Sequence, residues 1–175
     1  IKVVVVDTQV YSNTGGQAST SSYMGQNTKM SFHGTAVQGK TERRKELAQI
    51  CMMHPDVYVA QTTCADFNHF YKAVVAANEY PGPAIINVYT TCQPEHGVAD
   101  DMASAQARLA KESRAFPIFI HDPNAGDRLK ERIDLRGNPT VKEDWYTIPK
   151  TGEVIDFITF ARSEGRFSKH FDAEG

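Results

Sequence analysis

The sequence predicts an α/β fold in which a mainly parallel sheet is flanked by helices. Short apolar runs rich in β-branched residues alternate along the chain with longer segments of helical periodicity. Alternation at this spacing favours parallel strands joined by right-handed crossovers. The first six residues, IKVVVV, form a near-continuous apolar run that is typical of a strand buried on both faces of a parallel sheet.

Loops and a helix are expected after this first strand. A polar loop runs from Asp7 to Gln17, and the stretch from Gly25 to Thr41 lacks clear periodicity, which predicts a second loop. A helix is predicted over residues 42–53. Its apolar face consists of Leu47, Ile50 and Cys51.

The alternation of strands and helices continues to residue 120. A strand is predicted at residues 57–60, and a helix at 66–79 has Asp66 in the N-cap position. The apolar stripe of that helix is Phe67, Phe70, Tyr71, Val74 and Val75. The sequence Pro81-Gly82-Pro83 ends the helix. Three further elements are then expected: a strand at 84–89, a helix at 101–113 and a strand at 118–120.

The pattern changes beyond Asp122. Residues 122–127 have the composition of a turn, and residues 135–150 mix charge, proline and Trp145 with little periodicity. A terminal helix is expected over residues 155–167. These features predict an extended, irregular C-terminal segment that wraps a partner domain.

Length and composition limit the class of protein. With 175 residues the chain fits one domain, which we divide into an α/β part, residues 1–122, and the C-terminal segment, residues 123–175. A formal net charge of −2 gives no overall basic field for nucleic acid, and no apolar run reaches the ~20 residues of a membrane-spanning helix. Three cysteines without a CxxC pair favour a reducing, cytoplasmic setting. Because the chain opens inside a strand, we expect it to be a piece of a longer polypeptide.

The candidate functional loop is the stretch from Asp7 to Gln17, DTQVYSNTGGQ. It follows the first strand, and open parallel sheets bind ligands at the carboxyl ends of their strands. Magnesium needs oxygen ligands, which the Thr8 hydroxyl and the carbonyl group of Val10 or Ser12 could supply. The pair Gly15-Gly16 would let the backbone approach a phosphate and present N–H donors. From these residues alone, an ordinary turn without a ligand is an equally good interpretation.

The loop closely resembles the DTEVYSNTGGQ signature of the pyruvate:ferredoxin (flavodoxin) oxidoreductase family, with Gln9 in place of Glu. Residues 80–86, YPGPAII, resemble the YPGPSLI strand entry of that family. Residues 89–92, YTTC, match its YATC or YAPC strand end, and a shared His96-Gly97 follows. SEGRF at residues 163–167 resembles the NSEGRF segment of the family, so the resemblance runs from residue 1 to residue 167. Residues 19–32 and 39–48 depart from the family pattern.

This resemblance implies a thiamine-diphosphate-binding fold, with residues 1–122 forming the C-terminal part of the domain that binds thiamine diphosphate and Mg²⁺. The implied activity is oxidative decarboxylation of pyruvate, or another 2-oxo acid, with coenzyme A to acetyl-CoA and CO₂. Electrons would pass to iron–sulfur clusters and then to ferredoxin or flavodoxin. The resemblance also implies a homodimer when full length and a cofactor site completed by the remaining domains of the same enzyme.

The resemblance assigns roles to particular residues. Thr8, through its hydroxyl oxygen, and Val10, through its carbonyl oxygen, would bind Mg²⁺, and Asn13 would lie beside the cofactor as a catalytic residue. The remaining carboxylate ligand belongs to a GDG motif that lies upstream of Ile1 in this interpretation. Cys92 would be one of the four thiolates of a [4Fe–4S] cluster. The full set of cofactor-binding residues is Thr8, Val10, Ser12, Asn13, Thr14, Gly15 and Gly16.

Other interpretations stay open at this stage. A non-oxidative thiamine-diphosphate enzyme would not need Cys92, and a cofactor-free interaction domain could keep the fold without the activity. Cys92 could also be a small buried hydrophobic residue, as Cys51 and Cys64 are expected to be. The six histidines are scattered without a zinc-binding spacing. The run Arg43-Arg44-Lys45 is expected to be a solvated face, with docking of an acidic ferredoxin or of coenzyme A phosphates as the alternative.

Overall fold

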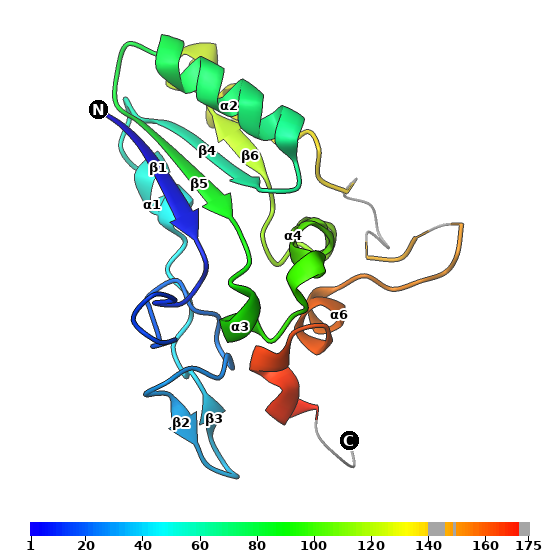
Figure 1. The fold of residues 1–175 in the computed structure, drawn as a ribbon. Helices are drawn as coiled ribbons and strands as arrows, with labels where there is room; N and C mark the ends of the chain where they lie inside the picture. Colours follow the sequence, from blue (N-terminus) through cyan, green and yellow to red (C-terminus); the bar gives the residue numbers. More distant parts are fainter. Residues whose placement is uncertain (140–145, 149, 172–175) are drawn as a thin grey trace.

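The computed structural model describes residues 1–139, 146–148 and 150–171, and these contain a five-stranded sheet of order β1–β5–β4–β6–β7 (Figure 1). Strands β1, β5 and β4 are parallel, whereas β6 pairs antiparallel with β4 and β7 antiparallel with β6. In chain order the strands of this sheet are β1 (Lys2–Asp7), β4 (Tyr58–Thr63), β5 (Ala84–Tyr89), β6 (Phe119–His121) and β7 (Ile133–Asp134). The predicted α/β fold with a mainly parallel sheet is confirmed.

Helices and a small hairpin complete the architecture. The α-helices are α1 (Leu47–Met52), α2 (Phe67–Glu79), α3 (Gln93–His96), α4 (Ala103–Glu112), α5 (Leu129–Arg132) and α6 (Phe157–Arg162). The 3₁₀ helices are η1 (Asp100–Met102), η2 (Pro123–Ala125) and η3 (Gly165–His170). The hairpin strands are β2 (Phe32–His33) and β3 (Gln38–Gly39). No helix among the described residues is both long and apolar enough to cross a membrane.

The two central strands bury side chains on both faces because successive residues of a strand point to opposite sides. Ala60 of β4 and Ile86 of β5 pack with Ala73 of α2 on one face. On the other face Val59 packs with Ala48, which lies in α1. Helices α1 and α2 therefore cover opposite faces of the parallel part of the sheet.

Strand β1 corrects one expectation, because it is not buried on both faces. It lies at the edge of the sheet, where β5 is its one partner among the described strands (Figure 1). Val4 is 54% exposed and Val6 is 65% exposed. The β-branched run favours an extended strand, but burial depends on neighbouring elements. Strands β4 and β5, which have partners on both sides, consist almost entirely of buried residues.

The ends of several elements also differ from the prediction. Helix α1 begins at Leu47 rather than at residue 42, and Arg44, in the non-helical stretch before it, pairs with Asp7. Residues 25–41, expected to be a loop, contain the β2–β3 hairpin. Helix α3 was not predicted, because four residues are too few to show a periodicity. Phe67 and Tyr71 of the predicted α2 stripe are exposed.

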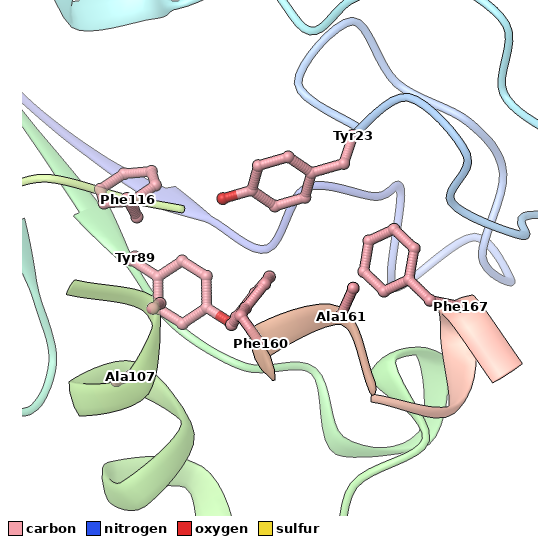
Figure 2. Close-up of a cluster of buried hydrophobic side chains, with 8 residues drawn as sticks. Tyr23, Tyr89, Ala107, Phe116, Phe160, Ala161 and Phe167 are labelled. Carbon is pink, nitrogen blue, oxygen red and sulfur yellow. The ribbon is translucent and has the colours of Figure 1, made fainter. Parts of the chain in front are cut away.

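An aromatic cluster joins the end of the chain to its beginning. Phe160 and Phe167, from α6 and η3, pack with Tyr23, Tyr89 and Phe116 (Figure 2). The ring centroids of Tyr89 and Phe116 are 5.3 Å apart, a separation typical of favourable aromatic pairs.

The described C-terminal residues thus pack on the α/β part of the same chain. This contact places α6 and η3 next to the carboxyl end of β5 (Figure 1). The expectations for Trp145 and for the last four residues lie outside the described residues.

Candidate functional site

The loop after β1 brings two of the expected magnesium ligands together. The Thr8 hydroxyl donates a hydrogen bond of 3.0 Å to the carbonyl oxygen of Val10. Two adjacent ligands of an octahedral Mg²⁺, each about 2.1 Å from the ion, lie about 3.0 Å apart. The Ser12 hydroxyl donates to Thr8 Oγ at 2.8 Å, and the Ser12 N–H donates to the Val10 carbonyl at 3.0 Å. The spacing of the two oxygens therefore fits neighbouring positions on one hard cation.

A cavity of about 380 Å³ opens beside this turn. Its lining includes Thr8 and Val10 together with Ile50 from α1. Asn13, which the resemblance places beside the same cofactor as Thr8, is not among the lining residues of this cavity. It is exposed, and no hydrogen bond between described residues involves its side chain.

Gly15 and Gly16 shape the loop. The sequence suggested that their N–H groups are free to bind a phosphate, but both donate hydrogen bonds within the loop. The Gly15 N–H donates to the Ser12 carbonyl at 3.2 Å, and the Gly16 N–H donates to the Tyr11 carbonyl at 2.9 Å. Both glycines have positive φ, +107° and +82°. A Cβ at Gly16 would also collide with the Glu95 carboxylate. The glycines are needed for the path of the chain, because a side chain is strained in this conformation.

A buried ion pair holds the end of β1. Arg44 Nη2 lies 3.4 Å from Asp7 Oδ2, and the two side chains are only 7% and 5% exposed. The guanidinium carbon of Arg44 also lies 4.8 Å from the ring centroid of Tyr23 and 5.2 Å from that of Phe116. The expectation of a solvated basic face is therefore wrong for Arg44. Its packing partners are distant in sequence, so a local charge pattern does not reveal its burial.

His96 contacts the same loop from α3. Its Nε2 atom lies 2.7 Å from the carbonyl oxygen of Thr8. A carbonyl can only accept, so Nε2 carries the proton and donates it. Burial and the neighbouring Arg166 lower the pKa of His96 to about 3. The ring is therefore neutral near pH 7, and its 3.7 Å approach to Glu164 is not an ion pair.

Arg166 and Glu164 form a second buried ion pair that sequence reasoning missed. The Nε group of Arg166 donates to Glu164 Oε2, and both side chains are 0% exposed. Arg166 Nη1 reaches Gln9 Oε1 at 3.4 Å and Gln26 Oε1 at 3.3 Å. The one departure from the family signature, Gln9, is thus the loop residue that meets this arginine. The signal that could have directed attention here is the SEGRF segment itself.

Cys92 lies on the same edge of the sheet as the candidate loop, as expected for parallel strands. The Thr90 N–H donates to the Asp7 carbonyl at 3.2 Å, which joins the ends of β5 and β1. Cys92 follows two residues later as the N-cap of α3 and is partly exposed. Among the residues that the structure describes, no group of three His, Cys, Asp or Glu side chains could hold a metal ion by itself. Cys92 would therefore need partners from outside these residues to bind a cluster.

This fold and loop define the class of protein: an α/β protein with a polar, glycine-containing loop at the carboxyl edge of its parallel strands. No family model matches the chain. It is 38% identical over 140 residues to the probable pyruvate-flavodoxin oxidoreductase of Escherichia coli (strain K12), which covers 79% of this chain. It is 33% identical over 159 residues, 90% of the chain, to the pyruvate:ferredoxin oxidoreductase of Moorella thermoacetica. A pyruvate dehydrogenase [NADP(+)] of Cryptosporidium parvum is 31% identical over 170 residues, 95% of the chain.

The chain belongs to the pyruvate:ferredoxin and pyruvate-flavodoxin oxidoreductase family, a family of oxidoreductases. The matched region is 11% of the length of the E. coli protein, 12% of the M. thermoacetica protein and 8% of the C. parvum protein. The chain thus spans about a tenth of the length of the relatives it matches.

Proposed function

We propose that this chain supplies one half of a magnesium and thiamine diphosphate site in an enzyme that oxidises pyruvate, or another 2-oxo acid, with coenzyme A. The observation that carries the proposal is the 3.0 Å separation of Thr8 Oγ and the Val10 carbonyl oxygen. It occurs within the loop that resembles the family signature. When bound, thiamine diphosphate supplies the carbanion chemistry that releases CO₂ from a 2-oxo acid.

The loop residues have distinct roles in this proposal. Thr8 and Val10 hold Mg²⁺, and Ser12 orients the Thr8 hydroxyl through its 2.8 Å hydrogen bond. Thr14 steadies the turn, because its hydroxyl donates to Gln17 Oε1 at 2.7 Å. Asn13 has an exposed side chain and can act at the cofactor as the catalytic residue of the loop.

Gly15 and Gly16 contribute the shape of the loop rather than phosphate contacts, since their N–H groups are used within it. The diphosphate is then held through Mg²⁺ and through groups outside these residues. Magnesium commonly binds in this way, through few protein ligands and the phosphate oxygens of its substrate.

Electron transfer is the second part of the proposal. Cys92 supplies one thiolate to a [4Fe–4S] cluster whose other three thiolates come from the remaining domains of the same enzyme. The position of Cys92 on the edge that carries Thr8 supports this role, because it brings cluster and cofactor to one side of the sheet. The complete enzyme is proposed to be a cytoplasmic homodimer that passes electrons to ferredoxin or flavodoxin.

The proposal is tested in the complete enzyme with two substitutions at Thr8. Thr8→Val removes the hydroxyl at nearly constant shape, whereas Thr8→Ser keeps it. We expect Thr8→Val to raise the dissociation constant for thiamine diphosphate, at fixed Mg²⁺, by at least roughly tenfold. Thr8→Ser should restore most of the affinity, and Thr35→Val in the β2–β3 hairpin serves as the control. Equal affinity of the Thr8→Val and wild-type enzymes would show that this loop does not bind the cofactor.

A further inference from the structure

A buried arginine contacts the candidate loop from the far end of the chain. Arg166 is separated from Gln9 by 157 residues, yet its Nη1 and Nη2 atoms lie 3.4 and 3.5 Å from Gln9 Oε1. Aromatic rings surround the guanidinium, with the centroids of Tyr23 and Phe167 at 5.4 and 5.3 Å. A fully buried charge destabilises the folded state unless it is paired, and Glu164 pairs with Arg166.

The residue that Arg166 contacts has an unusual backbone. Gln9 has φ of +54°, a conformation that few residues other than glycine adopt. Its carbonyl accepts hydrogen bonds from Ser22 Oγ at 2.6 Å and Gln26 Nε2 at 3.1 Å, and its N–H donates to Asp7 Oδ1 at 3.0 Å. Strained residues persist where the surroundings hold them in several ways at once. Gln9 lies between Thr8 and Val10, so its conformation sets how their two oxygens face each other.

His96 holds the other side of the same turn and is itself in contact with Arg166. Its Nε2 atom is 2.7 Å from the Thr8 carbonyl oxygen and 3.2 Å from Arg166 Nη1. The guanidinium therefore borders both groups that fix the turn: the side chain of Gln9 and the ring of His96. Gln26 adds a third connection, because its Oε1 lies 3.3 Å from Arg166 Nη1 while its amide donates to Gln9.

We propose that Arg166 is a positioning residue that holds the turn from Thr8 to Val10, through Gln9 and Gln26, in the shape that brings the two oxygens together. This inference rests on the proposed function for its relevance to the cofactor. Arg166 touches neither oxygen, so its effect passes through its neighbours. The conformation of the loop after β1 therefore depends on the C-terminal SEGRF segment, which contains Arg166.

The test needs a variant that folds. Arg166→Gln alone would leave Glu164 buried without its partner, which is strongly destabilising. The double variant Arg166→Met with Glu164→Gln removes both charges and keeps similar shapes. Arg162→Gln removes an exposed arginine that stacks on Phe171 at the end of α6, directly before the SEGRF segment, and is the matched control.

The first measurement is hydrogen–deuterium exchange of the complete enzyme, read by mass spectrometry. In the double variant, we expect peptides covering residues 8–17 to exchange at least about tenfold faster, while peptides from β4 and β5 are unchanged. The single variant Arg166→Lys keeps the charge but lacks the planar fork, so it should also loosen the turn. Unchanged exchange at residues 8–17, or equal acceleration in β4 and β5, would overturn the positioning role.

The second measurement separates this inference from the proposed function. With a loosened turn, we expect the dissociation constant for Mg²⁺ and thiamine diphosphate to rise roughly tenfold. The turnover number at saturating cofactor should change little, because Arg166 is not a catalytic residue. A loosened turn with unchanged cofactor affinity would refute the assignment of the loop to the cofactor and leave the positioning role standing.

Discussion

The Nε2 atom of His96 lies 2.7 Å from the carbonyl oxygen of Thr8, although 88 residues separate them in the chain. This contact joins the short helix after β5 to the loop after β1. The aromatic cluster of Tyr23, Tyr89 and Phe160 then connects that region to α6. The candidate site is thus held by contacts from three parts of the sequence.

Phe160 is the residue through which α6 enters the core, with 0% of its surface exposed. Phe160→Ala should lower the free energy of unfolding by about 3–5 kcal/mol, because it removes apolar contacts and leaves a cavity. Chemical denaturation of the chain of residues 1–175 measures this. Phe67→Ala, at a residue that is 74% exposed, should change it by less than about 0.5 kcal/mol. A small effect of Phe160→Ala would mean that α6 does not pack on the α/β part.

His69 predicts a pH dependence of folding. Burial lowers the pKa of His69, and its Nδ1 atom lies 3.0 Å from Thr62 Oγ1. A histidine whose pKa is lower in the folded state stabilises the fold above its unfolded pKa, near 6.5, and that stability is lost as the pH falls. The free energy of unfolding should therefore decline below pH 6.5. The decline should be less than ~1.4 kcal/mol per pH unit, the slope when the unfolded state binds one proton more than the folded state.

Comparison of the wild-type chain with His69→Gln isolates this contribution, because the other titrating groups are shared. The difference between the two unfolding free energies should be larger at pH 7 than at pH 5. A difference that stays constant over this range would show that His69 does not titrate differently in the folded state.

Cys92 gives a prediction for the complete enzyme. Cys92→Ser should abolish one iron–sulfur signal in electron paramagnetic resonance, since a [4Fe–4S] cluster needs its thiolates. Thiamine diphosphate should still bind, because Cys92 is not part of the Thr8 turn. Cys64→Ser, at an exposed cysteine after β4, should leave all the signals in place. An unchanged cluster content in Cys92→Ser would make Cys92 a structural residue.

The chain of residues 1–175 by itself should bind thiamine diphosphate weakly or not at all. Thr8 and Val10 are neutral ligands, and Asp7, the acidic side chain next to them in the loop, is already paired with Arg44. Loss of a charged ligand from a magnesium site plausibly costs several kcal/mol, the scale of an unpaired buried charge. Calorimetric titration with Mg²⁺ and thiamine diphosphate measures the affinity. Micromolar binding would mean that the site is complete within this chain.

Much of the central fold could be predicted from local sequence. Helix α2 and strand β5 show their periodicity and are bounded by the Pro81-Gly82-Pro83 break. The exposure of β1 could not be predicted, because a β-branched run specifies an extended strand and not its neighbours. The antiparallel direction of β6 depends likewise on how the chain returns after α4.

The candidate site was predictable only in part. The resemblance of residues 7–17 pointed to Thr8 and Val10, which are joined by a 3.0 Å hydrogen bond, and their binding of Mg²⁺ stays a prediction. Arg44 and Arg166 were missed as buried charges. Arg44 pairs with Asp7, 37 residues away. Arg166 pairs with the nearby Glu164 but also contacts Gln9, 157 residues away, so the burial of both charges depends on distant segments.

The most direct test of the central claim is an experimental structure of the complete enzyme with Mg²⁺ and thiamine diphosphate bound. The account predicts an octahedral ion with Thr8 Oγ and the Val10 carbonyl oxygen as adjacent ligands, each at about 2.1 Å. Arg166 should remain within hydrogen-bonding distance of Gln9 in that structure. An ion held elsewhere, with the Thr8 hydroxyl still bonded to the Val10 carbonyl, would contradict the account.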